Sequence, residues 1–114
     1  MNVKSPGAPV QIEGASVTFK CIDNGGAVDT VDIEIDGKPS FTLTPAHDVV
    51  STLSKGDNDI FINIQVFGNP AGNLNRHYDI KITANDQEIA STVGDLAPKQ
   101  KGDIGYAEVT IVIV

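Results

Sequence analysis

The sequence predicts an all-β fold: a single-domain, antiparallel β-sandwich over residues 1–114, with a small open β-barrel as the alternative. Apolar and polar residues alternate in several short runs, as they do in strands that bury one face. Gly, Asn, Asp and Pro recur between these runs at intervals of about 8–12 residues, which is typical of strands joined by turns. No segment shows the period of an amphipathic helix.

The clearest strand is Ile60–Phe67, which we expect at the centre of the fold. Its predicted inward face carries β-branched residues, which favour a pleated and half-buried surface: Ile60, Ile62, Ile64 and Val66. Its predicted outward face carries Phe61, Asn63, Gln65 and Phe67. The segments 56–59 and 68–70 have the composition of turns and should bound the strand.

The N-terminal part is predicted to contain a flexible arm, residues 1–9, and a short edge strand at Val10–Ile12. The following strand has Val17, Phe19 and Cys21 on its inward face. From Val10 to Cys21, Gly14 is followed after two residues by Val-Thr-Phe-Lys-Cys, and this run resembles the first two strands of an immunoglobulin-type domain. The resemblance implies an immunoglobulin-like sandwich. The chain has no second Cys and no Trp, so that family's disulfide and its packing Trp are absent.

Turn chemistry allows three connections to be predicted. Asn24-Gly25 supplies the positive φ angles of a tight hairpin. Around Asp36-Gly37, a three-residue loop would place Ile33 opposite Phe41 and Val31 opposite Leu43, so that both faces stay consistent. We expect either this loop or a bulge that compensates for a two-residue loop. A two-residue loop at Asn85-Asp86 would place Ile82 opposite Ile89, Ile80 opposite Ser91 and Tyr78 opposite Val93. A final strand is expected within residues 104–114, where the last six residues are apolar on both faces.

Composition excludes several functions. The net charge is −7 and the eight basic residues are scattered, so a nucleic-acid ligand is not expected. No apolar run reaches the about 20 residues of a membrane-spanning helix. Cys21 is the only cysteine, so no intramolecular disulfide forms, and we expect it to pack as a small hydrophobic residue. No secretory signal is visible, which leaves the cytoplasm, non-classical export or a removed signal as alternatives.

Catalysis has little support in the sequence, and we do not expect an enzyme. His47 and His77 are the only histidines, and no Gly-x-Ser-x-Gly nucleophile turn is present. A Ca²⁺ site is better motivated, because Asp57 and Asp59 offer oxygen ligands on a predicted turn. The alternative is that these side chains bond their own backbone, as Asp and Asn do in many turns. No other cofactor is expected.

Two functions remain open. The first is a small non-catalytic binding module, in one form carbohydrate-binding and lectin-like, that acts through loops at one end of the sandwich. Its candidate ligand residues are Asn24, Asp57, Asn58, Asp59, Asn69, Asn73, Asn75, Arg76 and His77. The second is an assembly subunit that forms a homo-oligomer, such as a dimer, through outward apolar residues: Phe61, Phe67, Val112 and Val114.

One acidic group has two interpretations of its own. The segment 23–36 contains no Lys or Arg and five acidic residues: Asp23, Asp29, Asp32, Glu34 and Asp36. They form either a solvated face that keeps sheets from pairing edge to edge, which is the simpler interpretation, or a docking site for a basic partner.

Overall fold

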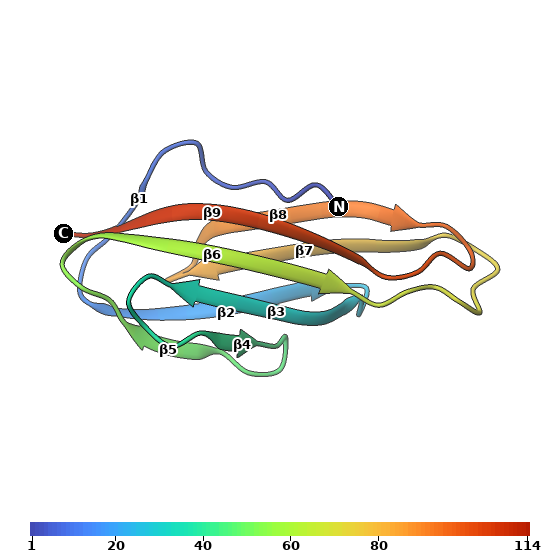
Figure 1. Cartoon of the computed structure of the whole chain (residues 1–114), viewed down its shortest axis with the longest axis horizontal. Helices are drawn as coiled ribbons and strands as arrows, with labels where there is room; N and C mark the ends of the chain where they lie inside the picture. Colours follow the sequence, from blue (N-terminus) through green and yellow to red (C-terminus); the bar gives the residue numbers. More distant parts are fainter.

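The computed structural model describes all 114 residues, and it contains nine strands and no helix. The strands are β1 (Val10–Ile12), β2 (Ser16–Asn24), β3 (Val28–Ile35), β4 (Phe41–Leu43), β5 (Val49–Thr52), β6 (Gly56–Val66), β7 (Arg76–Ala84), β8 (Gln87–Leu96) and β9 (Asp103–Ile113). They form a five-stranded sheet in the order β1-β9-β6-β3-β4 and a four-stranded sheet in the order β5-β2-β7-β8. The sheets pack face to face in an elongated molecule (Figure 1). The predicted β-sandwich is confirmed, and the sheets do not close into a barrel.

β6 lies in the middle of the five-stranded sheet, as predicted, between β9 and β3. Ile60, Ile62, Ile64 and Val66 are all buried, whereas Phe61 is exposed. The predicted turn at residues 56–59 is wrong, because β6 begins at Gly56 and pairs with β9 from there to Val66. The long β9 supplies a backbone partner for every one of these residues, and this ladder outweighs the local turn preference of Gly, Asp and Asn.

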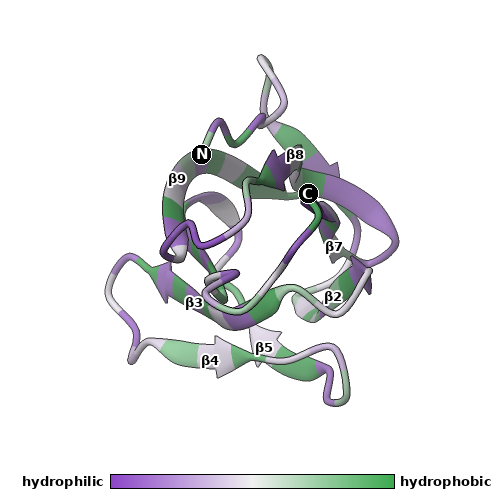
Figure 2. Cartoon of the chain, turned by 90° about the vertical axis from the view of Figure 1, so that its right-hand side faces the viewer, coloured by the Kyte–Doolittle hydropathy of each residue, from purple (hydrophilic) through white to green (hydrophobic).

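A single cluster of 26 buried apolar residues fills the space between the sheets. Val17, Phe19 and Cys21 of β2 belong to it, as predicted. Viewed along the long axis, β9 and β3 lie on one side of this interior and β2 and β7 on the other (Figure 2). The core therefore depends on the inward faces of long strands from both sheets.

The connection between β2 and β3 is not a tight hairpin, because the two strands belong to different sheets. Gly25 and Gly26 do have positive φ angles, of 112° and 64°. The Asp23 carboxylate accepts hydrogen bonds from the backbone N–H groups of Ala27 (3.2 Å) and Val28 (3.0 Å). The turn residues predict that the chain changes direction here. The sheet that β3 joins depends on tertiary contacts.

The register of β3 and β4 is the predicted one, with Ile33 opposite Phe41 and Val31 opposite Leu43.

The strand order of the four-stranded sheet, which contains β2, departs from that of the immunoglobulin family. There the sheet that holds the second strand is built from strands A, B, E and D. Here that sheet takes β7 and β8 from the part of the chain that follows β6.

The β7–β8 hairpin has the predicted turn but not the predicted register. Asn85 and Asp86 form the two-residue loop with φ angles of 45° and 65°. A bulge then shifts the pairing between Ile82 and Thr83, so that Ile82 lies opposite Ala90. Ile89 and Ala90 are both buried. Beyond them, the residues of β8 that were predicted to face inward face outward, and those predicted to face outward face inward.

The bulge decides which side chains of β8 enter the core. Val93, predicted to face inward, is 64% exposed, and Thr92 is only 2% exposed. Tyr78 lies opposite Gly94, and a Cβ atom at this glycine would collide with the Tyr78 hydroxyl. Burial raises the pKa of Tyr78, with Asp103 and Asp95 adding to the effect.

The first four residues are tied to the sandwich, whereas a flexible arm was expected through residue 9. Lys4 exchanges two backbone hydrogen bonds with Ser91 (2.7 and 2.9 Å), and Thr92 Oγ1 donates to the Asn2 carbonyl (2.8 Å). The N-terminal ammonium lies 2.9 Å from Asp103, and its hydrogen bond lowers the pKa of that carboxyl. The segment passes along the open side between β8 and β9 (Figure 1) before β1 adds to β9 in parallel.

The two faces of β6 give a direct test of the fold. Ile62 is buried, and Ile62→Ala should lower the free energy of unfolding by about 2–5 kcal/mol, because the shorter side chain leaves a cavity in the core. Phe61→Ala, one residue away on the solvent side, should cost less than about 1 kcal/mol. Urea denaturation followed by circular dichroism measures both values. Equal losses, or a larger loss at Phe61, would mean that the faces are reversed.

Cys21 gives a second test. Burial raises the pKa of its thiol to about 12, and Asp23 adds to the effect. Almost no thiolate is then present at pH about 8, so Ellman's reagent should not react until the protein is unfolded. Because the ordinary pKa is 9.0, the unfolded state loses its proton first, and the free energy of unfolding should fall as the pH rises from 9.0 towards 12. Rapid labelling of the native protein would contradict this burial.

Candidate functional site

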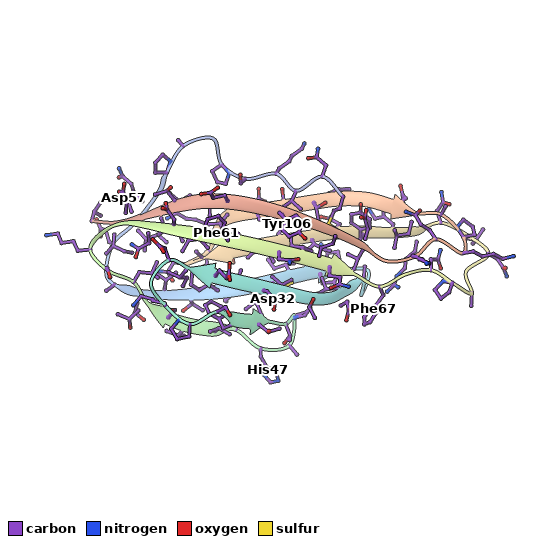
Figure 3. All side chains as sticks on the ribbon, in the orientation of Figure 1. Asp32, His47, Asp57, Phe61, Phe67 and Tyr106 are labelled. Carbon is purple, nitrogen blue, oxygen red and sulfur yellow. The ribbon has the colours of Figure 1, made fainter.

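The nine predicted ligand residues do not form one site. Six of them lie at the end of the sandwich where β2 ends and β7 begins: Asn24, Asn69, Asn73, Asn75, Arg76 and His77. Asp57, Asn58 and Asp59 lie at the start of β6. β6 runs between the two groups for 11 residues, a length of roughly 35 Å. Figure 3 shows Asp57 near the left end of the molecule and Phe67 to the right of the middle, beyond the other end of β6.

Two of the six residues are occupied in holding the loops together. Arg76 donates from Nη2 to the Gly26 carbonyl (2.6 Å) and from Nη1 to the Gly68 carbonyl (3.2 Å). Its guanidinium also lies over the Phe67 ring, 5.9 Å from the centroid. Asn69 Nδ2 lies 2.9–3.4 Å from the carbonyl oxygens of Leu74, Leu96 and Ala97. These side chains satisfy backbone groups of the connections, as irregular segments require.

The other four residues remain at the surface. Asn24, Asn73 and Asn75 are exposed. His77 is exposed as well, and its Nδ1 lies 3.0 Å from Asp95 Oδ1 across the outer face of the four-stranded sheet. His47, the second histidine, is exposed in the connection between β4 and β5.

The start of β6 divides its polar residues between two faces. Asp57 and Asp59 point to solvent, and Asn58 is buried. Asn58 Oδ1 accepts from Ser54 N (3.2 Å), and Nδ2 lies within 3.3 Å of the carbonyls of Ser54, Gly56 and Ile111. The turn that motivated the Ca²⁺ site is absent, and the structure has no group of three or more His, Cys, Asp or Glu side chains placed to hold a metal ion.

Phe61, Phe67 and Val114 are exposed, as predicted, but the four outward apolar residues do not form one patch. Phe67 lies six residues beyond Phe61, about 20 Å along the strand direction. Val112 is partly buried and pairs with Asp57, on the other side of Phe61. Val114 is exposed at the end of the chain. Polar and acidic residues separate these positions.

The surface hollow with the largest volume lies on the outer face of the five-stranded sheet. It is a shallow groove of about 360 Å³, lined by Asp32, Glu34, Ser40, Phe61, Ile62, Asn63, Tyr106 and Ala107. Phe61 is 45% exposed and Tyr106 is 67% exposed. Figure 3 shows Asp32, Phe61 and Tyr106 over the middle strands of this sheet. The groove combines two aromatic rings, two carboxylates and one amide.

The strand register arranges these side chains in two rows. Phe61 lies between Glu34 of β3 and Glu108 of β9. In the next outward row, Asn63 lies between Asp32 and Tyr106. Asp32 is fixed further by Thr42, whose Oγ1 donates to Asp32 Oδ1 (2.9 Å). The backbone ladder therefore places a carboxylate on each side of Phe61 and the Asn63 amide beside Tyr106.

This face is acidic and has no basic residue on its strands. Its outward carboxylates are Asp32, Glu34, Asp57, Asp59 and Glu108. None of them takes part in an ion pair. Lys38 of the β3–β4 turn lines a second hollow beside Glu34, without a salt bridge to it. Five of the 15 acidic residues of the chain thus lie on a sheet face whose strands carry no basic residue.

The sequence places Asp32 and Glu34 in one acidic group and Phe61 on an outward face, but it does not join that group to the ring, and Tyr106 is not among the candidate site residues. The alternation of the last strand does place Tyr106 on the face opposite to Val109 and Ile111. Its pairing with Asn63 depends on the register between β6 and β9, which are separated by the whole β7–β8 hairpin. Only the assembled sheet defines the groove.

Asn58 can be tested as a structural residue. Asn58→Ala should lower the free energy of unfolding by about 1–3 kcal/mol, because it leaves buried backbone groups without partners. Asp57→Ala, its exposed neighbour, is the matched control and should change the stability by less than about 0.5 kcal/mol. Thermal and urea unfolding measure both. An Asn58→Ala protein as stable as the wild type would show that these bonds contribute nothing.

Comparison with protein-family models, with curated proteins and with solved structures finds no match to this chain. The structure contains no helix that could cross a membrane. The groove on the five-stranded sheet is therefore characterised by its own chemistry: exposed aromatic rings, an amide and unpaired carboxylates held on adjacent strands.

Proposed function

We propose that the protein is a non-catalytic binding module whose ligand lies on the outer face of the five-stranded sheet. The observation that carries this proposal is the exposure of Phe61 and Tyr106 within one groove. Ligand sites typically combine apolar and aromatic surface with a few polar groups that fix orientation. Asn63, Asp32 and Glu34 are polar groups of this kind.

The groove is also built on rigid elements. Its aromatic and amide side chains come from β6 and β9, which are paired over 11 positions. Side chains on such a ladder lose little further freedom on binding, which favours affinity. A carbohydrate ligand, as expected from the sequence, would stack on the rings and donate hydroxyl groups to the carboxylates. Such a site would lie on the sheet face and not at the loop end.

The loop end supports the proposal less well. Asn69 and Arg76 are already bonded to backbone carbonyls and are not free for a ligand. Only the outermost amides, Asn73 and Asn75, remain exposed in the long β6–β7 connection. We therefore place the ligand on the sheet face.

Self-association through the same face is the alternative, and the charges disfavour it. A symmetric dimer would bring the carboxylates of one copy against the same carboxylates of the other, with no basic strand residue to offset them. Association of that kind would strengthen with added salt, because salt screens like-charge repulsion. A solution mass that rises above 12 kDa with salt would support it.

The position of the site can be tested with two double variants. Wild-type protein is applied to a glycan array and to a peptide array, and the bound ligand class is then measured with each variant. Phe61→Ser combined with Tyr106→Ser should reduce binding by at least about tenfold, because it removes both stacking surfaces.

The matched control is Asn73→Ala combined with Asn75→Ala at the loop end, which should change the affinity by less than about twofold. Circular dichroism checks that both proteins are folded. If binding is lost in the loop variant and kept in the aromatic variant, the site is at the loop end. If wild-type protein retains no ligand on either array, the proposal fails.

A further inference from the structure

We infer that the ligand of this groove is an arginine-bearing, basic segment of a partner protein. This inference rests on the proposed function and names the ligand class. The guanidinium group would lie against Phe61 and Tyr106, with Asp32 and Glu34 as its carboxylate partners. Neighbouring basic residues of the same segment would meet the remaining carboxylates of the face.

Charge complementarity is the first argument. Five outward carboxylates share one sheet face that has no Lys or Arg on its strands and no ion pair. Asp32 and Glu34 lie two residues apart on the same face of β3, where like charges repel one another and a bound cation relieves that repulsion. A neutral ligand would cover the carboxylates without compensating their charge.

The aromatic rings give the second argument. An exposed ring attracts a cation to its face, and arginine stacks on aromatic planes while its planar fork bonds carboxylates. The same chain already shows this chemistry internally, where Arg76 lies over Phe67 and donates to two oxygen acceptors. The groove offers a comparable set, with a ring next to oxygen acceptors, but without its own guanidinium.

The extent of the face favours a polypeptide over a small amine. Asp57 lies six residues from Asn63 on β6, about 20 Å away, and Asp59 lies between them. One small cation in the groove would leave these carboxylates unpaired. A second copy of this chain is a poor occupant, because its net charge is −7 and its corresponding face is equally acidic.

The test uses a fluorescein-labelled peptide of alternating arginine and glycine, with fluorescence anisotropy as the readout. A peptide with citrulline in place of arginine is the matched control, because citrulline keeps the shape and removes the charge. The arginine peptide should bind wild-type protein at least about tenfold more tightly than the citrulline peptide, and the difference should shrink as salt is added.

Variants then locate the binding. Asp32→Asn combined with Glu34→Gln should weaken binding of the arginine peptide by at least about tenfold. The amide oxygen of Asn at position 32 can still accept the hydrogen bond from Thr42 Oγ1. Asp79→Asn combined with Glu88→Gln removes the same charge from the other sheet and should weaken binding by less than about twofold. Equal losses in both variants would mean that only net charge attracts the peptide, and the inference would be overturned.

The outcomes separate this inference from the proposed function. If a glycan or a neutral peptide binds and is lost in the Phe61→Ser, Tyr106→Ser protein, while the arginine peptide does not bind, the site is confirmed and the cationic ligand is rejected. If the arginine peptide binds with the expected dependence on Asp32 and Glu34, both stand. If no probe depends on the groove residues, both fail.

Discussion

The antiparallel ladder between β6 and β9 is the constraint on which the rest of the molecule depends. It runs over 11 paired positions from Gly56 to Val66, in the middle of the larger sheet. Because side chains alternate along a strand, one ladder builds two surfaces. Its inner side supplies the isoleucines that fill the core, and its outer side holds Phe61, Asn63 and Tyr106 in fixed positions. The core and the groove are therefore two faces of the same interaction.

The polar residues of this chain serve two separate purposes. Those in the connections are largely used within the protein: Asn69 and Arg76 bond backbone carbonyls of the connections and of the end of β8. Those on the outer face of β3, β6 and β9 are left without cationic partners. Such a face repels a second copy of itself, which limits uncontrolled sheet stacking. The same property is the basis of the cationic ligand that we propose for this face.

The edges of the sandwich are protected by short or irregular strands. β4 and β1 have only three residues each, and β8 carries a bulge at Ile89, opposite Ile82 and Thr83 of β7. The N-terminal segment pairs with Ser91 and passes between β8 and β9. Short, bulged or covered edges offer poor templates for pairing with another chain. The middle of the five-stranded sheet, and not its edges, is left as the open surface.

The sequence by itself determined the fold class, the central strand and its inward isoleucines, the register of β3 and β4, and the turn at Asn85-Asp86. These features depend on alternation and turn chemistry, which act over a few residues. Tertiary structure decided the rest. It placed β2 and β3 in different sheets, shifted β8 by one residue at the bulge, and drew Gly56–Asp59 into a strand because β9 offered partners there. It also assembled the groove, because Asp32, Phe61 and Tyr106 become neighbours only when strands distant in sequence pair through backbone hydrogen bonds that no local pattern encodes.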